Sequence, residues 1–289
     1  MAEEIRTLNK EDLEFPEILK NIKGAPEKIY LRGKLPKSDL PLIAIVGTRK
    51  ATEDGLEIAF NIGKSLAETG VGVVSGLALG IDAAAHRGCL KGGGQTWGVL
   101  ARGLDEIYPA SHEALAKEII DAGGGLISEY SPGTAAYPNQ FLERNRIVSA
   151  LAGAVVVVEC PIPSGALTTA KHAAEQGKEV FVVPGSIFNQ NYRGSHMLLR
   201  EGARLVTSAK EILEDLDWKT KKSKKLENLE SPEIKLIMEI LNLEKSASVD
   251  RLQSLTKLEP RTISQILTQL EIEGQIAENG GFFKLIKDD

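Results

Sequence analysis

Four positively charged side chains stand in or beside stretches of the sequence that are rich in glycine: Arg49, Arg144, Arg146 and Lys171. Glycine lets a backbone approach a ligand closely, and the free N–H groups at a helix N-terminus favour anions. Together with arginine and lysine, such groups are a typical phosphate-binding set. Glycine is also needed in tight strand-to-helix turns, so these residues have to be read with the elements that position them.

From residue 42 the chain alternates apolar runs with segments of helical periodicity. This alternation predicts an α/β fold, a doubly wound, Rossmann-like and mostly parallel sheet with helices on both faces. Strands are expected at Leu42–Val46, Val71–Ser75, Trp97–Ala101, Leu126–Glu129, Ala154–Glu159, Val180–Val183 and Ala203–Val206. Helices are expected near 54–69, 80–91, 111–122, 140–152, 166–176 and 208–216.

Ligands of open parallel sheets bind beyond the carboxyl ends of the strands. Most loops in that position combine Gly with Ser or Thr, as in "GTRK", "SGLALGID" and "CPIPSGALTTAK". Arg144 and Arg146 begin the helix before Ala154–Glu159, and antiparallel packing would return them to the same edge. From spacing alone, an Arg144 paired with Glu143 or Glu159 for structural reasons fits equally well.

Aromatic side chains near these loops could supply faces on which nucleobases stack. The candidates are Phe141, just before Arg144, and Phe188, after the strand Val180–Val183. A place in the core is the more common fate of a residue such as Phe141.

Signals for catalysis or cofactor binding are missing from the sequence. No G-x-G-x-x-G follows the first strand of the alternation, and "GKS" at Gly63–Ser65 lies within a helix rather than a phosphate loop. The 4 histidines have no metal-site spacing, and no nucleophile elbow occurs. Asp82 stands in the first turn of a helix, where an acid favours the helix dipole. We expect a protein that is not an enzyme, with no metal and no cofactor.

Composition sets broad limits on the class of protein. With 42% hydrophobic and 26% charged residues among 289, the chain is ordinary for a globular protein. A net charge of −5 excludes a general polycation but not a local basic groove. There is no apolar run of ~18 residues and no signal-peptide core. Cys89 and Cys160 are far apart in apolar contexts, as is typical of reduced thiols. We expect a cytoplasmic protein without membrane contact.

Four segments are expected along the chain. Residues 1–40 contain a short helix and one strand leading into the sheet, and residues 41–217 form the Rossmann-like domain. Residues 218–231 are a lysine-rich linker. Residues 232–289 show three helical segments and then a hairpin with its turn at Gly280–Gly281, the pattern of a winged-helix domain.

Six stretches of the sequence are long and specific: "VGTR", "SGLALGIDAAAH", "GLDEIYP", "ERNRIVSAL", "ECPIPSGALTTAKHAAEQGKEVFVVPGS" and "RGSHMLLREGA". In this order they closely resemble the DNA processing protein A family, called DprA or Smf, over about residues 15–216. The C-terminal segment is similar to the winged-helix domain of many members. The resemblance implies an extended Rossmann-like fold, homodimers and a basic pocket for single-stranded DNA. It also implies partnership with the RecA recombinase, loaded onto incoming strands coated by the single-stranded DNA-binding protein SSB during natural transformation.

Carried over to this sequence, the family's DNA pocket would consist of Arg49, Ser75, Gly76, Arg144, Asn145, Arg146, Ser164, Gly165, Thr168 and Lys171. The sequence departs from the family pattern at three places. Only about 40 residues precede the first strand of the alternation, where many members have a SAM-like domain. "GTR" replaces the commoner "GSR", and "ARGLD" replaces "GxGLD", which adds Arg102. We expect a non-catalytic protein that binds and protects incoming single-stranded DNA and helps load RecA in transformation and recombination.

Two other functions compete with this hypothesis. Nucleotide phosphoribohydrolases of the LOG type resemble this fold and carry a catalytic acid in a "GGxGTxxE" loop. Here the matching stretch "PSGALTTAKHAAE" has no acid before Glu175. A regulator that binds duplex DNA would use the winged helix, but the helix after Pro260 offers only Arg261, with Lys257 before it. Protein contact or dimer support is the expected role of that domain.

Overall fold

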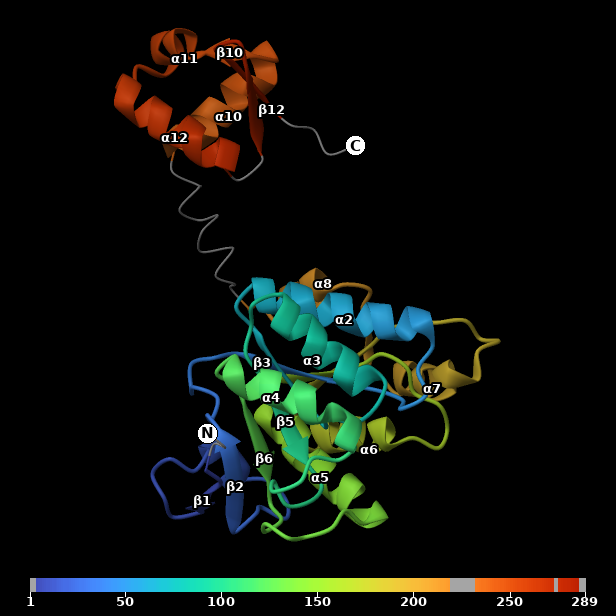
Figure 1. The fold of residues 1–289 in the computed structure, drawn as a ribbon. Coiled ribbons are helices and arrows are strands. Elements are labelled where there is room, and N and C mark those ends of the chain that lie inside the picture. Colours follow the sequence, from blue (N-terminus) through green and yellow to red (C-terminus); the bar gives the residue numbers. More distant parts are fainter. Residues whose placement is uncertain (1–3, 219–231, 273–274, 286–289) are drawn as a thin grey trace. The chain divides into compact units, whose positions relative to one another are not determined.

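The structure is a computed structural model that describes residues 4–218, 232–272 and 275–285. The chain divides into two compact units, Met1–Thr220 and Lys221–Asp289 (Figure 1). Apart from Trp218, the predicted lysine-rich linker lies outside the described residues. Each unit is taken by itself below.

A nine-stranded sheet in the order β1-β2-β6-β5-β4-β3-β7-β8-β9 forms the centre of the first unit. The strands are β1 (Arg6–Asn9), β2 (Lys28–Gly33), β3 (Leu42–Val46), β4 (Gly72–Ser75), β5 (Thr96–Leu100), β6 (Gly125–Ser128), β7 (Ala154–Val157), β8 (Glu179–Val182) and β9 (Arg204–Leu205). From β6 to β9 all neighbours pair in parallel, while β1 and β2 are antiparallel at one edge. The predicted α/β, Rossmann-like class is confirmed, and the N-terminal residues supply two strands of the same sheet rather than one.

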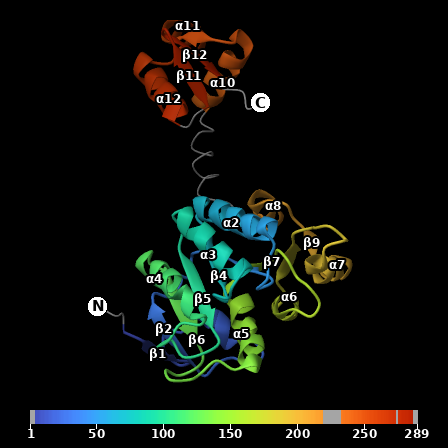
Figure 2. The same cartoon turned by 45° about the vertical axis from the view of Figure 1, so that its right-hand side comes forward.

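Helices cover both faces of this sheet: α1 (Glu17–Lys20), α2 (Glu53–Glu68), α3 (Ile81–Lys91), α4 (Glu113–Asp121), α5 (Pro138–Leu151), α6 (Gly165–Glu175), α7 (Arg193–Arg200) and α8 (Ala209–Asp215). One face packs against α2, α3 and α8, which run side by side in both ribbon views (Figure 2). The other face packs against α1, α5 and α6 through residues such as Leu19, Ile147 and Ala170. Helix α7 and strand β1 were not predicted from the sequence.

The order of the strands reverses between β3 and β7, because β4 and its successors lie on one side of β3 while β7, β8 and β9 lie on the other. In an open α/β sheet the crevice at such a reversal is the expected ligand site. The loops after β3 and β7 meet there, and the amide of Thr48 donates to the carbonyl of Glu159 across it (2.8 Å).

The second unit consists of α10 (Pro232–Glu244), α11 (Val249–Thr256) and α12 (Pro260–Ile272) around a three-stranded sheet. Its strands are β10 (Ala247–Ser248), β11 (Ile276–Asn279) and β12 (Phe282–Leu285), in the order β10-β12-β11. Gly280 and Gly281 both have positive φ in the turn between β11 and β12. Since a two-residue hairpin turn of this kind requires such φ values, the glycine pair explains the hairpin. This is the predicted winged helix.

Candidate functional site

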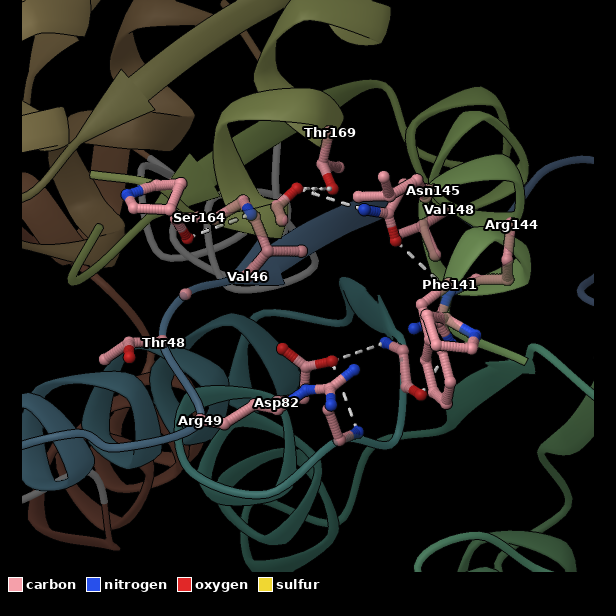
Figure 3. A pocket seen from close by; sticks show the side chains of 18 of the residues that line it. Val46, Thr48, Arg49, Asp82, Phe141, Arg144, Asn145, Val148, Ser164 and Thr169 are labelled. Carbon is pink, nitrogen blue, oxygen red and sulfur yellow. Dashed lines mark hydrogen bonds between the residues drawn. The ribbon is translucent and has the colours of Figure 1, made fainter. Parts of the chain in front are cut away.

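A pocket of about 650 Å³ opens at the reversal of strand order, between the loops after β3, β4 and β7 and the first turns of α5 and α6 (Figure 3). Of the residues predicted for a site, it is lined by Arg49, Gly76, Phe141, Arg144, Asn145, Ser164 and Gly165. These residues are up to 116 positions apart in the sequence, between Arg49 and Gly165. The fold therefore brings most of the predicted set together.

Arg144 lies against the pocket although its side chain is almost entirely buried (4% exposed). Its Nη1 donates to the carbonyl oxygens of Gly76 (2.6 Å) and Val99, and its Nε donates to the Asn145 side chain (3.2 Å). None of these acceptors is a carboxylate. Burial lowers the pKa of Arg144 to about 10, an effect that nearby Asp82 opposes and Arg49 increases. The pocket thus keeps a largely uncompensated positive charge.

The alternative partners that the sequence allowed for Arg144 are used elsewhere. Glu143 accepts hydrogen bonds from Tyr130 (2.9 Å) and Asn139 (3.2 Å). Glu159 is fully buried and accepts from the amide of Thr52 (3.0 Å), among others, and not from the guanidinium. Arg144 is therefore directed to the pocket rather than to a structural ion pair with either acid.

Asp82 holds the loop after β4 in place beneath the pocket. Its Oδ2 accepts from the backbone amides of Gly76 (3.0 Å) and Ala78 (3.3 Å). Burial raises the pKa of this carboxyl, while the Arg144 charge and the two amides lower it. A Cβ on Gly76 would lie 2.5 Å from Arg144 Nη2 and 2.6 Å from Asp82 Oδ2, so this position has room only for glycine.

Arg49 lies over the ring of Phe141, with its guanidinium carbon 4.6 Å from the ring centroid. Tyr108 packs against the same ring, with the two centroids 5.7 Å apart. Within the described residues, neither Arg49 nor its exposed neighbour Lys50 forms an ion pair. Two unpaired cations and an aromatic ring thus share one wall of the pocket.

The first turn of α6 forms the opposite wall. Ser164 caps the helix, and its hydroxyl accepts from the amide of Ala166 (3.2 Å). The Asn145 side chain donates to the carbonyl of Gly165 (3.0 Å) and so ties α5 to α6. The amide of Gly165 donates to no acceptor in the described part of the chain. A helix N-terminus with a free amide next to arginine side chains favours an anion.

Two predicted cations do not reach this pocket. Arg146 forms a bidentate ion pair with Glu129 (2.7 and 2.6 Å) and donates to the carbonyl of Gly24 (3.0 Å). It lines a separate cavity beside α1. Lys171 is 76% exposed, lies 3.9 Å from Glu175 and is not among the pocket residues.

Three uncharged candidates are also outside the pocket lining. The Ser75 hydroxyl is buried and donates to the carbonyl of Ile45 (2.6 Å), so it joins two strands. Thr168 does not line the pocket, whereas the next residue, Thr169, does. Phe188 is 89% exposed on the loop after β8 and is not part of the pocket wall.

Some pocket residues were not singled out as site residues from the sequence. Thr48 and Lys50 flank Arg49 in the "GTRK" loop, so the loop position itself was a usable signal. Tyr108 follows β5 in "GLDEIYP", and Asp82 had been explained by the helix dipole alone. Among described residues, no group of three or more His, Cys, Asp or Glu side chains could hold a metal ion, and no helix is long and apolar enough to cross a membrane.

The fold and the site define a class of protein: a Rossmann-like domain with a basic pocket at the switch point of its sheet, followed by a winged-helix unit. Residues 6–217 match the family described as DNA recombination-mediator protein A, and residues 224–281 match the DprA winged-helix domain. The chain belongs to this family, the DprA or Smf proteins.

Relatives of known name support the assignment. DNA processing protein DprA of Streptococcus pneumoniae is 37% identical over 71% of this chain and 72% of its own length. Protein Smf of Escherichia coli is 40% identical over 67% of this chain and 52% of its own length. The chain therefore spans only about half of some relatives.

Solved structures of the family have the same fold. The Streptococcus pneumoniae DprA structure has a TM-score of 0.68 at 36% identity and covers 73% of this chain and 74% of its own. The Helicobacter pylori DprA structure, described in terms of its single-stranded DNA binding mode, has a TM-score of 0.65 at 29% identity, over 75% of this chain and 98% of its own.

Proposed function

We propose that this protein binds single-stranded DNA in the pocket and does not act on it chemically. The observation that carries the proposal is the charge of the pocket wall. Arg49, Lys50 and Arg144 line it without ion pairs to described carboxylates, and Asp82 is the one lining carboxylate within the described chain. Such a wall attracts the phosphates of a strand.

Single strands fit this pocket better than duplex because its cations surround an aromatic ring. An unpaired nucleobase can enter a pocket of about 650 Å³ and contact the ring region, whereas a paired base is held inside the duplex. The Helicobacter pylori relative, described as binding single-stranded DNA, supports the same choice of ligand.

The test is fluorescence anisotropy with a labelled 35-mer and its duplex at several salt concentrations. With two to four phosphates bound, the slope of log K against log salt should be about −1.4 to −2.8. Arg49→Ala should weaken binding, and Lys210→Ala should not, because Lys210 is 83% exposed on α8 and outside the pocket lining. Salt-insensitive binding, or a preference for duplex, would overturn the proposal.

We further propose that the protein acts as a homodimer in the cytoplasm, protects incoming strands and helps load the RecA recombinase on DNA coated by SSB. Support comes from the family, which is described as a recombination mediator. The test is RecA filament formation on SSB-coated single strands with and without the protein. The dimer is tested by light scattering of the full chain. No acceleration of filament formation would contradict the mediator role.

The two competing functions receive less support. Glu175, the acid that a LOG-type hydrolase would need, lines the cavity beside α1 with Arg146 rather than the pocket. In the winged-helix unit, Arg251 is engaged by Glu244 (3.0 Å). Release of free base from a nucleoside monophosphate, lost on Glu175→Gln, would restore the hydrolase hypothesis. Duplex binding lost on Arg261→Ala would favour the regulator.

A further inference from the structure

The ring of Phe141 is already occupied on one face. The guanidinium carbon of Arg49 lies 4.6 Å from the ring centroid, Tyr108 packs against the ring at 5.7 Å, and Arg144 lies 6.0 Å away. A nucleobase that stacked directly on the covered face would have to displace Arg49. The base-stacking role predicted for Phe141 therefore needs a different surface.

Arg49 differs from the other arginines around α5 in what holds it. Arg144 is held by carbonyl oxygens and Arg146 by Glu129. In the described chain the Arg49 side chain makes no hydrogen bond and no ion pair, and the residue is exposed. Its contact with the Phe141 ring is what sets the position of its guanidinium.

We propose that Arg49 is the base-stacking platform of the pocket, and that Phe141 is the positioning residue beneath it. A guanidinium is planar and stacks on aromatic faces, so one face can lie on Phe141 while the other receives an unpaired nucleobase. This inference rests on the proposed binding of single-stranded DNA. It assigns Arg49 to the bases rather than mainly to the phosphates.

A stacking role and a phosphate role respond differently to Arg49→Lys. Lysine keeps the positive charge and would still attract a phosphate, but its ammonium has no planar face for a base. If Arg49 served phosphates alone, the lysine variant would bind nearly as well as wild type. As a platform, the same variant loses the stacking contact, on the order of tenfold in affinity.

The experiment compares two 35-mers of equal charge, one with normal bases and one with abasic tetrahydrofuran units throughout. Arg49→Lys and Phe141→Leu should each bind the normal strand about tenfold more weakly than wild type. Both should bind the abasic strand as wild type does, and the double variant should lose no more than either single one. Arg200→Lys, an exposed change outside the pocket, is the charge-preserving control.

The outcomes separate this inference from the function on which it rests. If wild type binds the normal strand and Arg49→Lys binds it equally well, the platform role is wrong while the binding function stands. An equal loss on normal and abasic strands also overturns it, because the lost contact would then be to the backbone. Arg49 is exposed, so its lysine variant should fold even if Phe141→Leu does not. If wild type fails to bind single strands, both proposals fall.

Discussion

Arg144 and Arg146 lie two residues apart on α5, yet the regions around them use positive charge in opposite ways. On the pocket side, Arg144 is held by neutral acceptors, the carbonyls of Gly76 and Val99. On the other side, Arg146 is matched by both carboxylate oxygens of Glu129. The first arrangement holds a cation in place without neutralising it, and the second neutralises it.

This difference separates residues that bind from residues that stabilise. A cation held by carbonyl dipoles retains its attraction for a phosphate, because no carboxylate has to be displaced. A partly buried bidentate pair contributes to folding instead, since its charges satisfy one another. The comparison predicts that changes in the pocket region affect both DNA binding and stability, while changes around Arg146 affect stability alone.

The largest effect is expected from Arg144→Ala. The change leaves two buried carbonyls without their donor and Asp82 without its nearby cation. We expect a loss of about 3 kcal/mol in the free energy of unfolding and loss of single-strand binding. Chemical denaturation and anisotropy measure the two effects. Binding retained at wild-type strength would break the comparison.

Gly76→Ala tests the same region without removing a charge. The added methyl group would meet Arg144 Nη2 at 2.5 Å and Asp82 Oδ2 at 2.6 Å, so both side chains must shift. We expect a stability loss of about 2 kcal/mol and weaker binding of single strands. A matched control is Gly133→Ala, where a Cβ meets nothing within 4 Å but φ is +84° and costs backbone strain only. The control should leave binding intact.

Arg146→Ala should do the opposite of the pocket variants. Both side chains of its pair with Glu129 are only 16% exposed, so we expect a loss of about 1.5 kcal/mol in stability. Affinity for single strands should stay within twofold of wild type. A double-mutant cycle with Glu129→Ala measures the coupling of the pair. A large loss of affinity with unchanged stability would show that the regions had been assigned the wrong way round.

Acid pH adds a charge to the pocket region through His86 on α3. Burial first, then the charges of His112, Arg144 and Arg87, lowers its pKa from 6.5 to about 3. The unfolded chain therefore takes up the proton first, and stability falls as the pH drops below 6.5 toward 3. We expect about 1 kcal/mol lost between pH 6.5 and 5.5. Denaturation curves of His86→Gln should lack this component.

The smallest effect is expected from Lys171→Ala. This lysine is exposed, faces Glu175 at 3.9 Å and lies outside the pocket. Exposed pairs of this kind contribute little, so stability and single-strand affinity should both stay within twofold of wild type. A loss as large as that of Arg49→Ala would extend the binding surface along α6.

The sequence was informative about the sheet because its central strands are continuous apolar runs. Leu42–Val46 was predicted with its observed bounds as β3. Helix α7 was missed because it is short and has glycine in its first turn, where the sequence pattern gives no helix signal. Gly194 is there for packing, since a Cβ would meet the carbonyl oxygen of Cys160 at 2.6 Å. Strand β1 was missed because only Leu8 of its residues is buried.

The site was harder to predict, because spacing determines direction but not the partner. The sequence placed Arg144 near the ligand edge, but the choice between a pocket and an ion pair depended on distant residues. Arg146 need not have been grouped with it, since residues two apart on a helix point to different sides. Lys171 illustrates the same limit, because a residue near a helix start can still face solvent.

The pairing of β2 with β6 has a consequence for the order of assembly. Tyr30 lies opposite Ser128, so two neighbours in the sheet are separated by about a hundred residues of chain. On a ribosome, the hairpin of β1 and β2 emerges long before the strand that it joins. The first part of the protein to be synthesised must therefore wait for the sixth strand before its edge of the sheet is complete.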